Sequence, residues 1–163
     1  MLLKNLDEKD ALEFLNNLTP RTIQDLLSVN LKTDFKTISD HVIFNFDFEL
    51  GGLKTGYLDY VVNEKITLQY FQTLKETPFL KRNGLYDGRD KLNSYNLGLL
   101  CLATATNDLK GSYDSKKIIF SKPFSVLGEK FFQGLGVELT KRQSFKDYSS
   151  IIFKEANKRG FDF

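Results

Sequence analysis

The run HVIFNFDFEL, residues 41–50, decides the fold, together with the glycine pair at 51–52 and the run LKTGYLDYVV at residues 53–62. Apolar side chains alternate with polar ones along the first run, and this period of two is typical of a β-strand with one buried face. Two such runs joined by two glycines are the sequence form of a tight hairpin. The sequence therefore predicts a β-hairpin over residues 41–62.

The register of this hairpin follows by counting outward from the turn. If Leu50 faces Leu53, the other pairs are Glu49 with Lys54, Phe46 with Tyr57, Phe44 with Asp59 and Val42 with Val61. This register places opposite charges beside the turn and aromatic rings along one face. It also places Asp59 on the apolar face, where an unpaired carboxylate is costly to bury.

Further elements are predicted on both sides of the hairpin. Residues 64–74 favour a strand, although their apolar residues also fit helical spacing, and residues 116–121 favour a short strand. Helices are predicted over residues 7–18, 19 to about 29, 90–110, 125–135 and 144–160. The second has Thr19 as N-cap and Pro20 at its first position, and the last has Ser144 and Gly160 at its two caps. For residues 125–135 the alternative is irregular structure or strands.

The helix around Leu99 is apolar on almost every side, which predicts that it is the central buried helix. The expected fold class is α+β, with an antiparallel sheet made of the hairpin 41–62 and two or more further strands. This sheet is expected to pack against the central helix, with an N-terminal helical pair and a C-terminal helix beside it. With 163 residues, of which 41% are hydrophobic, the chain is expected to form a single globular domain over residues 1–163.

The sequence also predicts a compartment. No apolar stretch reaches the ~20 residues that a transmembrane helix needs. Acidic residues follow the N-terminal Met1 closely, which is not the pattern of a signal peptide. The single cysteine, Cys101, excludes an internal disulfide. We therefore expect a cytoplasmic protein without a membrane partner, and the sequence leaves its oligomeric state open.

Side chains suited to catalysis are scarce. Cys101 and His41 are the only cysteine and histidine, and Cys101 lies in the apolar run LLCLA, where burial makes a thiol unreactive. In the predicted register Asp47 and Glu49 lie on the face opposite Asp59, so these carboxylates do not converge on a metal ion. No glycine-rich phosphate-binding loop is present. The sequence predicts no metal site and no cofactor, and it favours a protein that is not an enzyme.

Two segments carry residue types that are common in protein interfaces. The loop at residues 81–89 presents Arg82, Tyr86 and Arg89, and Tyr and Arg are enriched among residues that dominate binding energy. The C-terminal tail presents Phe161 and Phe163 beside the terminal carboxylate. The structural alternatives are a surface loop in the first case and a helix cap with Phe161 folded back in the second.

The C-terminal part of the chain is basic, although the formal net charge of the whole chain is only +2. Residues 141–159 hold six basic and two acidic side chains. Such a patch suits a phosphate-bearing partner, and its structural alternative is a solvated helix face. The candidate nucleic-acid contacts are Lys141, Arg142, Lys146, Lys154, Lys158 and Arg159.

A third candidate site is a pocket for a hydrophobic ligand between the phenylalanine ladder and the central helix. Phe44, Phe46 and Tyr57 would line it, and Asp59 would supply the carboxylate. The chain holds 15 phenylalanines and no tryptophan, so the structural alternative is that these rings fill the core.

These observations favour a small intracellular, non-catalytic binding protein that acts on a protein partner. An accessory, immunity or inhibitor role fits such a chain, and the composition, rich in Lys, Asn and Phe, suggests an AT-rich genome or a mobile element. The first alternative is a nucleic-acid-binding protein that uses the basic C-terminal helix. The second is an enzyme or carrier for a small hydrophobic ligand.

Overall fold

The computed structural model describes residues 5–7, 9–10, 13–14, 17–36, 40–73, 96–121 and 126–163. Their fold is α+β, as predicted, with four helices and a six-stranded sheet. None of the described helices is both long and apolar enough to cross a bilayer. The elements in chain order are α2 (Pro20–Leu26), β1 (Leu27–Lys36), β2 (His41–Leu50), β3 (Leu53–Val62), β4 (Ile66–Thr73), α4 (Leu97–Leu109), β5 (Lys117–Phe120), α5 (Val126–Leu135), β6 (Gln143–Ser144) and α6 (Phe145–Lys158).

The sheet is mixed and not purely antiparallel, which corrects the prediction. Its strands lie in the order β1-β2-β3-β4-β5-β6, and neighbours are antiparallel except for β4 and β5. Parallel neighbours need a crossover connection, and the segment between β4 and β5 includes α4. The predicted strands at 64–74 and 116–121 are confirmed as β4 and β5.

The hairpin of β2 and β3 is confirmed, but its register is not the predicted one. The pairs Leu50–Leu53 and Glu49–Lys54 form as expected, and then a β-bulge shifts the register between Phe48 and Glu49. Thr55 is the extra residue, and its buried hydroxyl donates to the Phe48 carbonyl over 3.2 Å. Beyond the bulge Phe44 faces Tyr60, Phe46 faces Leu58 and Asn45 faces Asp59.

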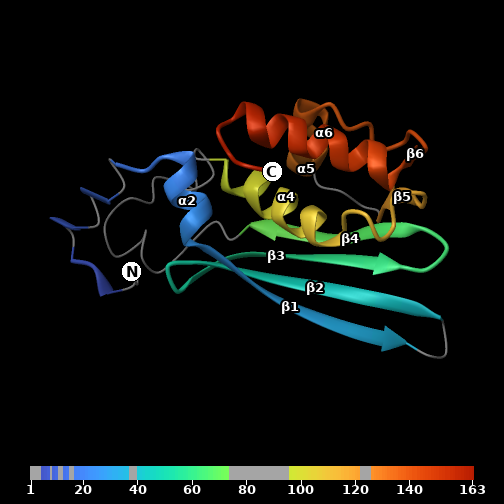
Figure 1. Ribbon diagram of the computed structural model, residues 1–163, viewed down its shortest axis with the longest axis horizontal. Helices are drawn as coiled ribbons and strands as arrows, with labels where there is room; N and C mark the ends of the chain where they lie inside the picture. The colour runs from blue at the N-terminus through green and yellow to red at the C-terminus, as the bar shows by residue number, and fades with distance from the viewer. Residues whose placement is uncertain are drawn as a thin grey trace.

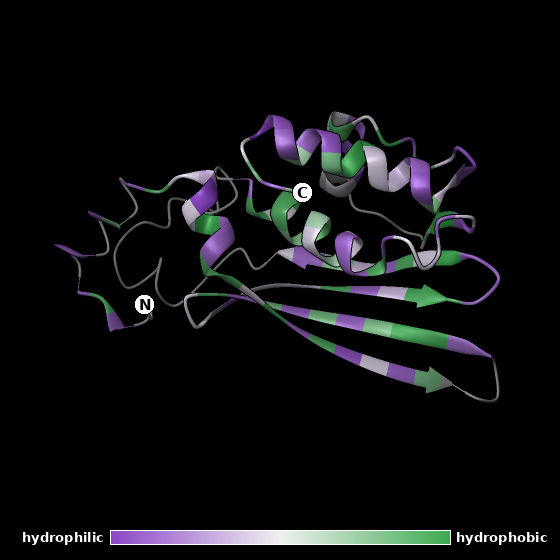
Figure 2. Cartoon of the chain, in the orientation of Figure 1, coloured by the Kyte–Doolittle hydropathy of each residue, from purple (hydrophilic) through white to green (hydrophobic). Residues whose placement is uncertain are grey.

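The bulge assigns side chains to the two faces of the sheet. One face, here called the inner face, carries Phe46, Leu58 and Leu68, all of which are buried in the core. The opposite face, here called the outer face, carries Asn45 and Asp59. Figure 2 shows the alternation of hydrophobic and hydrophilic residues along β1 and β2 that creates these two faces.

The second predicted helix is shorter than expected. Its start is confirmed, because Thr19 is the N-cap of α2 and Pro20 takes the first position. It was predicted to run to about residue 29, but it ends at Leu26, since Leu27 adopts extended backbone angles and begins β1. The predicted first helix, residues 7–18, lies partly outside the described residues, so the helical pair is not part of the described fold.

The helices gather at one side of the sheet. Figure 1 shows α4, α5 and α6 beside β3, β4 and β5, with β1 at the far side of the sheet from them. α4 packs against β3, β4 and α6, and most of its side chains are buried, including Leu99 and Cys101. The core therefore lies between these helices and the inner face, and its cover thins toward β1.

Caps close the last two helices, and the predicted N-cap of α6, Ser144, is confirmed. Gly136 has a φ of +86° after α5, and the N–H of Val137 donates to the Phe132 carbonyl over 2.9 Å. The Ser144 side chain accepts from the Asp147 N–H at the start of α6. α6 ends at Lys158 with Arg159 as its C-cap, and Gly160, the predicted cap residue, follows one position later with a φ of +97°.

Candidate functional site

β1 is an open edge of the sheet. It has ten residues and pairs with β2 only, so within the described part of the chain one side of its backbone has no strand beside it. The opposite edge is different, because β6 has only two residues and leads directly into α6. A long edge strand offers a row of N–H and C=O groups that a further strand can pair with.

The inner face of β1 is apolar and exposed. Leu31 is opposite Phe46 and is 39% exposed, and Phe35 is opposite Val42 and is 70% exposed. Thr33 lies between them and is also exposed. Large apolar side chains exposed on one face of an open edge strand are typical of a surface that binds another polypeptide.

Charged side chains of β1 lie on the other face. Lys32 and Asp34 are exposed and share the outer face with Asn30, because side chains alternate along a strand. The edge thus carries one positive and one negative charge two residues apart, on the face opposite Leu31 and Phe35.

β1 lacks most devices that keep an edge from pairing. Its register with β2 runs from Leu27 to Lys36 without a bulge, and it contains no proline. No charged residue of the strand points to the inner face between Val29 and Phe35. We take β1 as the candidate functional site.

Sequence reasoning missed this site although a signal was present. Leu27, Val29, Leu31 and Phe35 follow the same alternation that predicted the hairpin. The apolar residues of α2 continue at helical spacing through Leu27, so the change from helical to strand spacing at this residue is not visible from that pattern alone.

The predicted interface loop lies outside the described residues. Arg82, Tyr86 and Arg89 all fall within residues 74–95, so the prediction made for them remains a prediction.

The C-terminal tail is folded back onto its own chain. Phe161 is only 4% exposed, and the Phe163 ring stacks on Phe153 with 5.8 Å between ring centroids. Asp162 is tied to Gln24 by two hydrogen bonds, of 2.8 and 2.9 Å. A ring buried in its own core does not present itself to a partner, so the structure matches the alternative in which Phe161 completes the cap of α6.

The basic residues are exposed and only partly gathered. Lys146, Lys154 and Lys158 lie at multiples of four residues along α6 and so follow one oblique stripe, which winds about 120° around the helix between Lys146 and Lys158. Arg159 is not part of the stripe, because it donates to Glu155 over 3.0 Å and to Asn96. Lys141 and Arg142 are exposed ahead of β6.

The four residues of the predicted pocket do not converge. Phe46 is buried and Phe44 half-buried on the inner face, whereas Tyr57 and Asp59 lie on the outer face. The bulge causes this separation, since it moves every residue of β3 beyond Thr55 by one position. The pocket prediction is therefore wrong as stated, and Phe46 fills the core.

The outer face carries a pair of tyrosines that sequence reasoning did not single out. The rings of Tyr57 and Tyr70 stack with 4.9 Å between centroids and 18° between planes. The Tyr57 hydroxyl donates to Oε1 of Gln72 over 3.0 Å. These contacts join β3 to β4, so the tyrosine pair is explained as a cross-strand cluster that stabilises the sheet.

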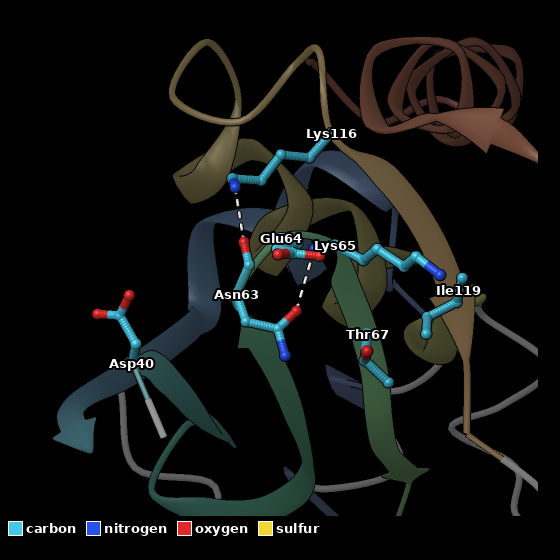
Figure 3. Close-up of a pocket in the computed structure, with 7 residues that line it drawn as sticks. All are labelled: Asp40, Asn63, Glu64, Lys65, Thr67, Lys116 and Ile119. Carbon is cyan, nitrogen blue, oxygen red and sulfur yellow. Dashed lines mark hydrogen bonds between the residues drawn. The ribbon is translucent and has the colours of Figure 1, made fainter. Parts of the chain in front are cut away.

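A polar groove lies at the end of the sheet near the turn between β3 and β4 (Figure 3). Lys116 Nζ donates to the Asn63 carbonyl over 2.6 Å, and the Asn63 side chain accepts from the Lys65 N–H over 3.0 Å. These bonds brace the turn, so Lys116 serves the fold at this place. The groove is lined by Asp40, Asn63, Glu64, Lys65, Thr67, Lys116 and Ile119.

Cys101 and the hydroxyl groups of Tyr60 and Tyr148 are buried in the core. Burial raises the pKa of the Cys101 thiol far above its usual value, which leaves the thiol protonated and unreactive. The Tyr60 hydroxyl lies at the centre of a buried cluster, and its oxygen is 2.9 Å from the hydroxyl oxygens of both Thr106 and Tyr148. Burial raises the pKa of Tyr60 to about 12. The cluster joins β3, α4 and α6 and satisfies its own polar groups.

Comparison with known proteins adds no functional assignment, because no family model, curated protein or solved structure is significantly similar to this chain.

Proposed function

We propose that this chain is a non-catalytic protein-binding module and that β1 is its docking site. A segment of a partner protein pairs with the open edge of β1 and adds a strand to the sheet. In this binding mode the backbone hydrogen bonds supply affinity, and alternate side chains supply specificity. Leu31 and Phe35 are the side chains of the inner face that would meet the added strand.

One observation supports the proposal most directly. A ten-residue edge strand carries a side chain as large as Phe35 with 70% of its surface exposed. Exposing such a ring forgoes most of the ~2 kcal/mol that its burial contributes. A strand added at the edge would cover part of this surface.

The state of the buried reactive groups supports the non-catalytic part of the proposal. Cys101 is enclosed by core residues, and the hydroxyls of Tyr60 and Tyr148 bond to each other inside the protein. All three side chains are buried, and none of them lines the polar groove near the turn between β3 and β4.

Site-specific photo-crosslinking in the source cells tests the proposal. A photoreactive amino acid would replace Thr33, which is exposed between Leu31 and Phe35. We expect irradiation to link position 33 to an extended segment of another polypeptide, which mass spectrometry maps. The matched control carries the same group at position 70, since Tyr70 is 48% exposed on the outer face of β4. No adduct at position 33, or equal adducts at both positions, contradicts the proposal.

The second candidate function is nucleic-acid binding through α6. It is favoured by the exposed stripe of Lys146, Lys154 and Lys158, which spans about 18 Å along the helix. Counterion release predicts an affinity for RNA or DNA that falls steeply with salt concentration. Lys154→Glu with Lys158→Glu should then abolish binding in a gel-shift titration, whereas unchanged binding excludes this surface.

The role and the location remain part of the proposal. Binding by strand addition suits an accessory, immunity or inhibitor protein, because such proteins act by occupying a surface of another protein. A cytoplasmic location suits the lone Cys101, since thiols stay reduced in that compartment.

A further inference from the structure

We propose that the strand received by β1 is β1 of a second copy of this chain. The two strands run antiparallel about a two-fold axis at Thr33 and join the two sheets into one. This inference rests on the proposed function, because it names the partner of the same edge.

The symmetry restricts how two copies of β1 can pair. A two-fold axis that relates antiparallel neighbours stands perpendicular to the sheet, so the inner faces of both copies lie on the same side. Residues opposite each other point to the same face, and one residue of each copy must therefore face its own counterpart. Four registers are centred near the middle of the exposed part of β1, and in each of them one residue from Leu31 to Asp34 lies opposite its own counterpart.

Charge excludes two of these registers. A pair centred on Lys32 places the two lysines directly opposite each other, and a pair centred on Asp34 does the same with the two aspartates. Like charges directly opposite each other destabilise an antiparallel pair.

The register centred on Thr33 is complementary on both faces. On the outer face, Lys32 of each copy lies opposite Asp34 of the second copy. On the inner face, Leu31 of each copy lies opposite Phe35 of the second copy. All four of these side chains are exposed in the single chain, and the register applies each pairing twice.

The register centred on Leu31 is less complementary. It places Lys32 opposite Asn30 and Phe35 opposite Leu27. Leu27 is already half-buried against the core of its own chain, so it offers less surface to Phe35.

The rest of the sheet favours a closed pair over a chain of copies. Pairing of β1 with the opposite edge would continue from copy to copy, but β6 has only two residues. The self-pair centred on Thr33 engages residues 30–36 of both copies, a seam of about 24 Å. It covers seven of the ten residues of β1 in both copies at once.

Sedimentation velocity over a wide range of protein concentrations tests the proposal. We expect a reversible monomer–dimer equilibrium for the wild-type chain. Lys32→Asp places a second carboxylate opposite Asp34 at two positions and should raise the dimer Kd about tenfold. The double variant Lys32→Asp with Asp34→Lys restores opposite charges and should return the Kd toward the wild-type value. A monomer at every concentration, or a dimer with the same Kd in all three proteins, overturns the proposal.

Disulfide trapping tests the register itself. Residues directly opposite in an antiparallel pair have Cα atoms about 4.5–5.5 Å apart, within the range of a disulfide. Thr33→Cys should therefore form a covalent dimer on mild oxidation. In Asn30→Cys, the matched control on the same strand, the two cysteines lie about 20 Å apart and should stay reduced. Linkage at position 30, or none at position 33, overturns this register.

The photo-crosslinking experiment separates the failure of this inference from the failure of the proposed function. An adduct at position 33 with a second copy supports both. An adduct with a different protein overturns the inference and leaves the proposed function standing, and no adduct overturns both.

Discussion

Asn45 donates a hydrogen bond from Nδ2 to Oδ1 of Asp59 over 2.5 Å, directly across the ladder between β2 and β3. The bond forms on the outer face of the sheet, so Asp59 is half-exposed there and does not lie among the phenylalanines of the core. The β-bulge at Thr55 is the cause, because it shifts the register of β3 by one residue.

Asp59→Asn should therefore change stability little. The new amide oxygen accepts the same bond from Asn45, and we expect the free energy of unfolding to change by no more than about 1 kcal/mol. Urea unfolding measures this, with Phe46→Ala as the control for a buried site, which should lose about 3–5 kcal/mol. A gain of several kcal/mol in Asp59→Asn would show that the carboxylate is buried on the apolar face.

The buried hydroxyl cluster predicts which of two substitutions, Tyr60→Phe or Tyr148→Phe, destabilises the protein more. Thr106 donates to the Leu102 carbonyl over 2.7 Å, so Tyr60 must donate to Thr106, and Tyr148 must donate to Tyr60. Tyr60→Phe removes both the donor to Thr106 and the acceptor that Tyr148 uses, and should cost about 1–3 kcal/mol.

Tyr148→Phe leaves the donation from Tyr60 to Thr106 in place and should cost less, about 1 kcal/mol. Urea unfolding of the two variants side by side checks the order. Equal costs, or a greater cost for Tyr148→Phe, would contradict the assigned directions of these hydrogen bonds.

The same cluster predicts a loss of stability in alkali. The pKa of Tyr60 is about 12 in the folded chain and about 10 in the unfolded chain, so the folded chain holds more protons between these pH values. This contribution is complete below about pH 10 and is lost as pH rises toward 12, by about 2–3 kcal/mol.

Unfolding followed by phenolate absorbance along an alkaline titration measures this loss. The Tyr60→Phe variant should show a shallower decline than the wild-type chain, because it lacks one of the titrating groups. Identical slopes would mean that the pKa of Tyr60 is the same in the folded and the unfolded chain.

Two glycines should respond in opposite ways to alanine. Gly160 has a φ of +97°, and a Cβ atom there would lie 3.0 Å from Cγ of Pro20. Gly160→Ala should therefore cost at least 1–2 kcal/mol, roughly the penalty of a left-handed residue. Gly134 lies within α5, and a Cβ atom added there would meet nothing within 4 Å, so Gly134→Ala should add about 0.5–1 kcal/mol. Thermal unfolding of both variants checks the signs, and a stabilised Gly160→Ala would contradict the cap geometry.

Local patterns predicted the elements whose cause is local. The alternation in residues 41–62 predicted the hairpin, and the signals at Thr19–Pro20, Ser144 and Gly160 predicted the start of α2 and both ends of α6. Each of these signals acts within a few residues, through strand period, cap hydrogen bonds or a left-handed backbone.

Three features of the fold were not predicted, each for a different reason. β1 was hidden by helical spacing that ran on from α2 through Leu27, although the alternation of Leu31 and Phe35 was a usable signal. The bulge at Thr55 shifts the register that was counted from the turn. Tyr57 and Asp59 therefore do not lie on the same face as the core phenylalanines. The parallel pair of β4 and β5 depends on a crossover between distant segments.

Photo-crosslinking from position 33 tests the role of β1 most directly, because Thr33 lies in the middle of the open edge of this strand and is exposed. We predict an adduct at position 33 with an extended protein segment, namely β1 of a second copy, and no comparable adduct at position 70. A chain that gives no adduct at position 33 in its source cells would contradict the claim that β1 is a protein-binding site.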